Sequence, residues 1–167
     1  MPDRPSYTPE RVATMPTFKR ILVPVDGSDA SSAAVALALK VAQSGGDASE
    51  LVFCHVVDAA AEYLAASQAQ YIGGAQDLIQ EERAAGAKLV DAAVKTAEDA
   101  GMKATAEVLE GNPAAAIVRR ARDGGFDLIV TGTHGRRGVE RLVLGSTVEG
   151  VLRATAVPVL AVKAPAT

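Results

Sequence analysis

Short apolar runs recur along the chain, and each ends in a polar or glycine-containing turn. They cover residues 19–25, 51–58, 102–110, 126–132 and 157–162. Most are apolar at nearly every position, which is typical of strands in a parallel sheet that is covered on both faces. The run at 102–110 alternates between apolar and polar residues, which predicts a less buried strand near an edge of the sheet.

Four segments with helical periodicity separate these strands, at residues 29–43, 76–100, 113–123 and 146–154. Ser28 or Asp29 is a suitable N-cap for the first, and Asn112 caps the third with Pro113 at its first position. Alternating strands and helices with right-handed crossovers predict an α/β fold. We expect a doubly wound five-stranded parallel sheet, Rossmann-like, with the flavodoxin-like strand order 3-2-1-4-5.

The periodic pattern predicts a single domain over residues 18–163. Residues 1–17 contain several prolines and no periodicity, which predicts a flexible N-terminal tail. Residues 164–167 are expected to form a short C-terminal tail. Residues 59–75 are less regular than their neighbours, and the sequence assigns them no role.

Charge and composition exclude several functions. The net charge is −3 and the isoelectric point is about 5.4, so no basic footprint favours nucleic-acid binding. No apolar run reaches the ~18 residues of a membrane span. The N-terminus has no signal-peptide core, so a cytoplasmic protein is expected. The single cysteine, Cys54, lies within an apolar run and is expected to be a buried, reduced thiol.

The predicted topology places a ligand site at two strand ends. In an open parallel sheet, ligands bind beyond the carboxyl ends of the strands where the strand order reverses, which here lies beside the first strand. Pro24, Val25 and Asp26 end the first strand, and Thr131 and Gly132 end the fourth. Both ends are therefore expected to face one crevice.

The segment from Gly132 to Thr147 has features of a phosphate site. Backbone N–H groups at a helix N-terminus attract anions, and glycine lets backbone approach a phosphate closely. Three arginines and one glutamate give residues 136–144 a charge of +2, and Ser146 and Thr147 open the last predicted helix. Neither the P-loop pattern G-x-x-x-x-G-K-[ST] nor G-x-G-x-x-G is present.

Each of these features also has a purely structural interpretation. Ser146 and Glu149 match a capping box, in which Ser146 is the N-cap and needs no ligand. Asp26 begins an Asp-Gly turn, and the glycines allow a tight exit from the fourth strand. His134 is expected in an exposed loop, without the neighbouring ligands that a metal site needs. The placement of the features on adjacent strand ends is what favours a binding site.

The chain resembles the universal stress protein family. Gly132, Gly135, Gly145 and Ser146 satisfy G-x2-G-x9-G-[ST] directly after a strand. The segments ILVPVDGS, HVVD, GNPAAAIV and VPVLAVK are further landmarks in the same order, so the resemblance covers about residues 18–163. It implies an α/β fold like the one derived above and a homodimer. Because the glycine motif is intact, it also implies the ATP-binding type of member.

The resemblance assigns a role to each part of the site. It implies that the end of the first strand lines the adenosine end and that the backbone of Val56 meets the adenine edge. The glycines would close over ribose and phosphates, with Mg²⁺ shared between phosphates and water. With Thr131 added from the end of the fourth strand and Arg137 from the charge of the loop, the candidate nucleotide-binding residues are Pro24, Val25, Asp26, Val56, Thr131, Gly132, Gly135, Arg136, Arg137, Gly145, Ser146 and Thr147.

These residues favour a binding protein over an enzyme. ATP hydrolysis needs a positioned water and a base or orienting group, and the only carboxylate between residues 132 and 147, Glu140, lies next to an arginine. We expect an ATP-binding stress-response or regulatory protein, whose nucleotide occupancy modulates conformation, assembly or a partner. Two alternatives stay open: a slow ATPase or phosphotransferase, and a binder of AMP or cyclic AMP or an interaction module with a vacant site.

The last predicted strand bears on assembly. Residues 157–162 are apolar and are expected at an edge of the sheet, where an unpaired strand favours pairing with another copy. A homodimer through this strand is therefore expected. The alternative is that a helix covers the strand. An unidentified protein partner also stays open.

Overall fold

The computed structural model describes residues 17–45, 49–58, 60, 64, 67, 75–134 and 144–164. Residues 1–16 of the tail expected at 1–17, residues 165–167 of the tail expected at 164–167, and most of the segment 59–75 lie outside this part. The described elements lie within two residues of the predicted bounds. They are β1 (Arg20–Pro24), α1 (Asp29–Ser44), β2 (Glu50–Val57), α3 (Ala75–Asp99), β3 (Lys103–Glu110), α4 (Pro113–Asp123), β4 (Leu128–Gly132), α5 (Ser146–Ala154) and β5 (Val159–Val162).

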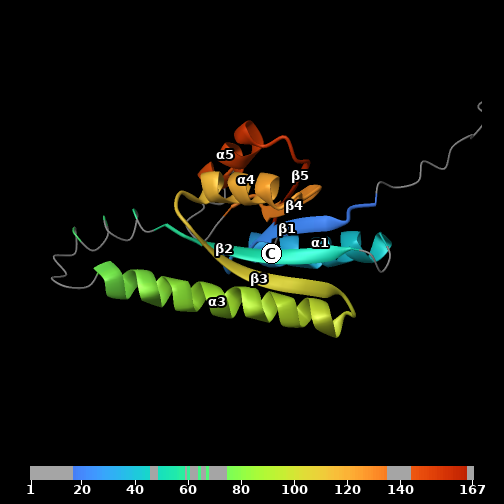
Figure 1. The fold of residues 1–167 in the computed structure, drawn as a ribbon, viewed down its shortest axis with the longest axis horizontal. Coiled ribbons are helices and arrows are strands. Elements are labelled where there is room, and N and C mark those ends of the chain that lie inside the picture. The colour runs from blue at the N-terminus through green and yellow to red at the C-terminus, as the bar shows by residue number, and fades with distance from the viewer. Residues whose placement is uncertain are drawn as a thin grey trace, which may run out of the picture.

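The strands form one parallel sheet in the order β3-β2-β1-β4-β5, which confirms the predicted topology. β3 and β5 are its edges, as the sequence predicted. Figure 1 shows α4 and α5 on one side of the sheet and α3 on the other. The chain runs outward from β1 to β3 and then crosses to β4, so the strand order reverses between β1 and β4.

The core consists of small and medium-sized apolar side chains on both faces of the sheet. Alanines on α1 let that helix lie close to the strands, since a side chain of one carbon leaves little to separate them. The cluster beneath α1 and α3 includes Ile21, Val23, Ala34, Ala38, Leu51, Phe53, Val90 and Ala97. The cluster beneath α4 and α5 includes Leu22, Val52, Cys54, Ile117, Ala121, Ile129 and Val151.

Close packing also explains one glycine of the sequence motif. A Cβ on Gly132 would lie 2.7 Å from the carbonyl carbon of Ala30 and 2.8 Å from the backbone nitrogen of Ser31. Both atoms belong to the backbone of α1 and cannot move aside cheaply. Gly132 is therefore required where the end of β4 passes beneath the start of α1, apart from any ligand.

An ion pair fixes α4 on the edge of the sheet. Nε and Nη2 of Arg120 each donate to a carboxylate oxygen of Glu107 on β3, at 2.5 Å. This hydrogen bonding to Arg120 holds the pKa of Glu107 below its usual range. The pair anchors the body of α4, and the helix begins at the carboxyl edge of the sheet.

Gly86 fits α3 against β2. The side chain of His55, on β2, is only 3% exposed, and a Cβ on Gly86 would lie 2.1 Å from its Cδ2. Glycine at this position leaves the space that the imidazole occupies. Among the described helices, none is both long and apolar enough to cross a membrane.

Gly86→Ala tests this packing. Alanine inside a helix is normally more stable than glycine by about 1 kcal/mol. We expect the reverse here, a loss of about 1–3 kcal/mol in the free energy of unfolding, because the added methyl group overpacks against His55. Urea denaturation measures the change. In a His55→Ala background the space is free, so the same substitution should become stabilising. A Gly86→Ala protein more stable than the parent would contradict the close contact.

Candidate functional site

A crevice opens where β1 and β4 part. The register between them covers only Ile21 with Leu128 and Leu22 with Ile129. On its other side, β1 stays paired with β2 as far as Pro24. A cavity of about 590 Å³ lies at these carboxyl ends. Its volume falls within the range of roughly 300–1,000 Å³ that is typical of small-molecule sites.

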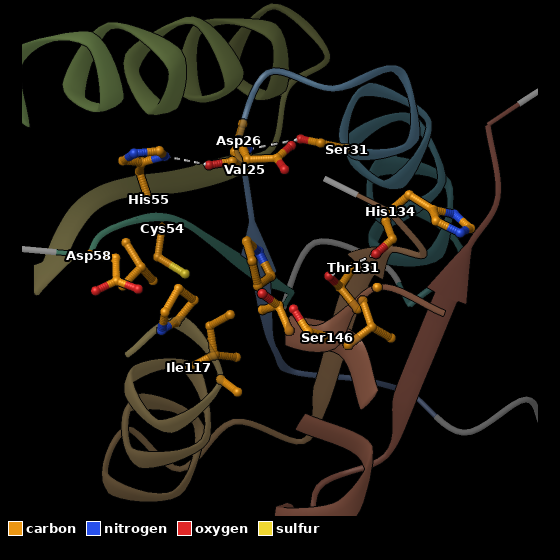
Figure 2. Close-up of a pocket in the computed structure, with 18 of the residues that line it drawn as sticks. Val25, Asp26, Ser31, Cys54, His55, Asp58, Ile117, Thr131, His134 and Ser146 are labelled. Atoms are coloured by element: carbon orange, nitrogen blue, oxygen red, sulfur yellow. Dashed lines mark hydrogen bonds between the residues drawn. The ribbon is translucent and has the colours of Figure 1, made fainter. Parts of the chain in front are cut away.

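The cavity brings together all the predicted site residues that the structure describes. They come from the ends of β1, β2 and β4 and from the start of α5, and Figure 2 shows several of them converging. Gly135, Arg136 and Arg137 lie outside the described residues. The predicted residues that line the cavity are Pro24, Val25, Asp26, Val56, Thr131, Gly132, Gly145, Ser146 and Thr147.

Sequence reasoning missed a second group of lining residues. The residues at the start of α4 could have been predicted, since α4 follows β3 and must begin at the carboxyl ends of the strands, as the other helices do. Glu82 could not have been predicted, because it lies inside α3 and only the packing of α3 on the sheet brings it to the cavity. The missed residues are Ser31, Cys54, His55, Asp58, Glu82, Asn112, Pro113, Ala114, Ile117, His134 and Val148.

Asp26 forms a tight turn and also lines the cavity. Its Oδ1 accepts hydrogen bonds from the backbone nitrogen of Ser28 at 3.0 Å and from the Ser28 hydroxyl at 2.7 Å. Its own N–H donates to Oγ of Ser31 at 3.2 Å, and Gly27 has a φ of 81°. The turn interpretation of Asp26 is therefore confirmed, and the turn places a carboxylate in the wall of the cavity.

Helices α1, α4 and α5 all begin at this edge, and their N-termini differ. Oγ of Ser28 caps α1 by accepting from the N–H of Ser31 at 3.1 Å. Oδ1 of Asn112 caps α4 by accepting from the N–H of Ala115 at 3.1 Å. Asn112 was predicted, and of the two candidates Ser28 and Asp29 the structure selects Ser28. At α5 the N-cap is Gly145, and no side chain of the described residues caps that helix. The positive end of α5 is thus the open one.

The predicted capping box at α5 is wrong. The N–H of Gly145 donates to the carbonyl of Thr133 at 2.8 Å, and Gly145 has the extended conformation of an N-cap. Ser146 is therefore already the first helical residue, and its side chain is exposed. Glu149 pairs with Arg153 instead.

His134 is also not the exposed loop residue that was expected. It is half-buried, and its Nδ1 lies 3.0 Å from Oγ1 of Thr133. Its carbonyl oxygen lies 3.2 Å from Oγ of Ser28, so the loops after β1 and β4 meet here. In the part of the chain that the structure describes, no three His, Cys, Asp or Glu side chains gather as around a bound metal ion.

Cys54 contributes an apolar, unreactive wall. The residue is fully buried, as predicted, and burial raises the pKa of its thiol to about 12. The thiolate, which is the nucleophilic form, is therefore scarce near neutral pH. Cys54 shapes the cavity without supplying covalent chemistry.

Two solved structures with nucleotide ligands share this fold. One is a universal stress protein in complex with cAMP, with a TM-score of 0.62 and 23% identity, covering 90% of this chain and 100% of that one. The other is a universal stress protein family protein of Arabidopsis thaliana with AMP bound, with a TM-score of 0.64 and 18% identity, covering 89% and 93%. At these identities the likeness is one of fold.

Closer relatives establish the family. The universal stress protein family profile matches residues 17–163. Universal stress protein MJ0531 of Methanocaldococcus jannaschii is 37% identical over 153 residues, 89% of this chain and 84% of the relative. The structure of MJ0577, from the same organism, has a TM-score of 0.79 and 26% identity, covering 91% of this chain and all of that one. The resemblance seen in the sequence is thereby confirmed, and the chain is a member of the universal stress protein family.

Proposed function

We propose that the cavity binds an adenine nucleotide, ATP with Mg²⁺ in the first place, and that occupancy regulates the protein's conformation, assembly or partner. The observation that carries the proposal is the open N-terminus of α5, whose first residues line the cavity. The N–H groups of Ser146, Thr147 and Val148 have no hydrogen-bond partner among the described residues. Such groups, with the helix dipole, attract phosphate oxygens.

Other parts of the lining suit an adenosine. Pro24, Val56 and Ile117 are apolar residues of the cavity wall, and such side chains can pack against the flat faces of a base. Asp26 adds a carboxylate that accepts hydrogen bonds, which is the group that ribose hydroxyls commonly meet. The lining thus combines apolar residues, a carboxylate and a helix N-terminus that attracts phosphate, which are the groups that a nucleotide needs.

The structures of relatives support an adenine nucleotide, since two of them hold cAMP and AMP. ATP is favoured for this chain because its sequence keeps the glycine motif and adds Arg136 and Arg137 to the same loop. In this proposal Mg²⁺ is held by phosphate oxygens and water, which is its usual arrangement with nucleotides. A regulatory role is favoured over turnover, and the cytoplasmic location stays a prediction.

Nucleotide addition should raise the melting temperature. At a free ATP concentration of 100 times Kd, binding adds about 2.7 kcal/mol of stability, which for a chain of this size is a rise of roughly 5–10 °C. Differential scanning fluorimetry with ATP–Mg²⁺, AMP, cyclic AMP and GTP measures the effect and ranks the ligands. Absence of a shift with every adenine nucleotide would contradict the proposal.

Ser146→Ala separates binding from folding in the same assay. Because Ser146 is not a cap, its loss should change the free energy of unfolding by less than about 0.5 kcal/mol. The substitution should raise the Kd for ATP about tenfold, as expected for the loss of a hydrogen bond to a charged group. Ser28→Ala is the comparison for the stability measurement alone, since it removes a true cap and should cost about 1 kcal/mol of stability. Unchanged ATP affinity in Ser146→Ala would contradict the phosphate assignment.

We also propose a homodimer through β5. β5 is an edge strand, and the carbonyls of Pro158 and Val162 accept hydrogen bonds from the β4 side. Because backbone groups alternate in direction along a strand, the N–H of Ala161 faces outward. That residue is exposed, so the outer edge of β5 offers unpaired backbone groups to a second copy.

Static light scattering at micromolar concentration tests the dimer. We expect twice the chain mass for the parent protein and a monomer for Ala161→Pro, because proline removes the outward donor while an edge strand tolerates it. Ala106→Pro places the same substitution on β3, the opposite edge strand, and should leave the dimer intact if that variant stays folded. A monomeric parent protein would contradict the assignment.

A further inference from the structure

The turn that carries Asp26 lies beyond the pairing of β1 with β4. Its backbone is held by β2 and by the first turn of α1 instead. The N–H of Val25 donates to the carbonyl of Cys54 at 2.8 Å, and the N–H of Asp26 donates to Ser31. The carbonyl of Val25 receives its hydrogen bond from a side chain, since Nδ1 of His55 lies 2.8 Å from it.

The imidazole of His55 is held from both sides. Its second nitrogen, Nε2, lies 3.2 Å from Oε1 of Glu82 on α3, and Gly86 leaves no space for the ring to move toward that helix. Figure 2 shows the ring at the end of β2, aimed at Val25. A carbonyl oxygen only accepts, so the proton of this contact must be on Nδ1.

We infer that His55 is a positioning residue: its Nδ1–H holds the carbonyl of Val25 so that the next residue, Asp26, faces the nucleotide cavity. The inference rests on the proposed function and deepens it. His55 lines the cavity itself, but its two ring nitrogens are committed to Val25 and Glu82. Its effect on a ligand is therefore indirect, through the turn.

Packing alone would not select histidine here. An apolar side chain of similar size fills the same space under Gly86, but it leaves the carbonyl of Val25 without a donor in a place where only 7% of that residue is exposed. The carbonyl of Val25 requires a hydrogen-bond donor that lies as far from the backbone of residue 55 as Nδ1 does. Asparagine carries its amide nitrogen the same number of bonds from Cβ as Nδ1, and glutamine carries its amide nitrogen one bond further.

The experiment compares His55→Asn with His55→Gln in the full-length protein. Isothermal titration with ATP–Mg²⁺ gives Kd, and thermal melting without nucleotide gives stability. We expect His55→Asn to stay within about threefold of the parent Kd and His55→Gln to weaken binding tenfold or more. The smaller asparagine side chain leaves the larger cavity, so the stability of His55→Asn should fall at least as far as that of His55→Gln. If lost stability alone weakened binding, His55→Asn would therefore bind ATP no more tightly than His55→Gln.

Two results would overturn the inference. One is a folded His55→Gln protein that binds ATP with the parent Kd. The other is an equal loss of affinity in both variants, which would mean that the donor at the position of Nδ1 does not matter.

A second measurement needs no nucleotide and keeps this inference apart from the proposed function. In ¹H–¹⁵N spectra of the free protein, the amide resonances of Asp26 and Gly27 should stay near the parent positions in His55→Asn and move in His55→Gln. If the parent protein binds no adenine nucleotide, the proposed function fails, and this comparison still decides whether His55 positions the turn. Unmoved resonances in His55→Gln would refute the positioning role.

Discussion

The separation of β1 from β4 is the constraint on which the site depends. Their register ends at Leu22 and Ile129, while β1 continues beside β2 to Pro24. The helices that follow β1 and β4, α1 and α5, pack on opposite faces of the sheet, so neither of these two helices fills the gap between the carboxyl ends of the strands. A cavity results from topology, and the residues around it decide what it can hold.

Around that gap, fold and site share the same residues. Gly132 is needed for the approach of β4 to α1, and Ser28 both caps α1 and fixes the carboxylate of Asp26. Gly86 leaves room for the ring of His55, which in turn supplies a donor to the wall of the cavity. Substitutions here should change stability and the proposed binding together. Ser146 differs, because its side chain takes part in no cap, so its substitution tests the proposed phosphate contact with little change in stability.

The sequence predicted the strand order and the convergence of the strand ends because both follow from apolar runs, turn signals and crossover handedness. It also placed the cap Asn112 correctly and named Ser28 as one of two candidates for the cap of α1. It failed at the N-terminus of α5, where the sequence matches a capping box with Ser146 as N-cap. The N-cap is Gly145 instead, and its N–H donates a hydrogen bond to the carbonyl of Thr133. The contact of His55 with Glu82 joins β2 to the middle of α3, and no local pattern encodes such a long-range contact.

In the proposed site, separate segments at the carboxyl ends of the strands bind a single adenine nucleotide. Backbone amide chemical shifts, measured while ATP–Mg²⁺ is added, test this proposal. We expect the largest changes in residues 24–28, at Val56, and in the first turn of α5 at 145–148, all with one common Kd. Changes confined to one of these segments, or centred on the β5 edge, would contradict it.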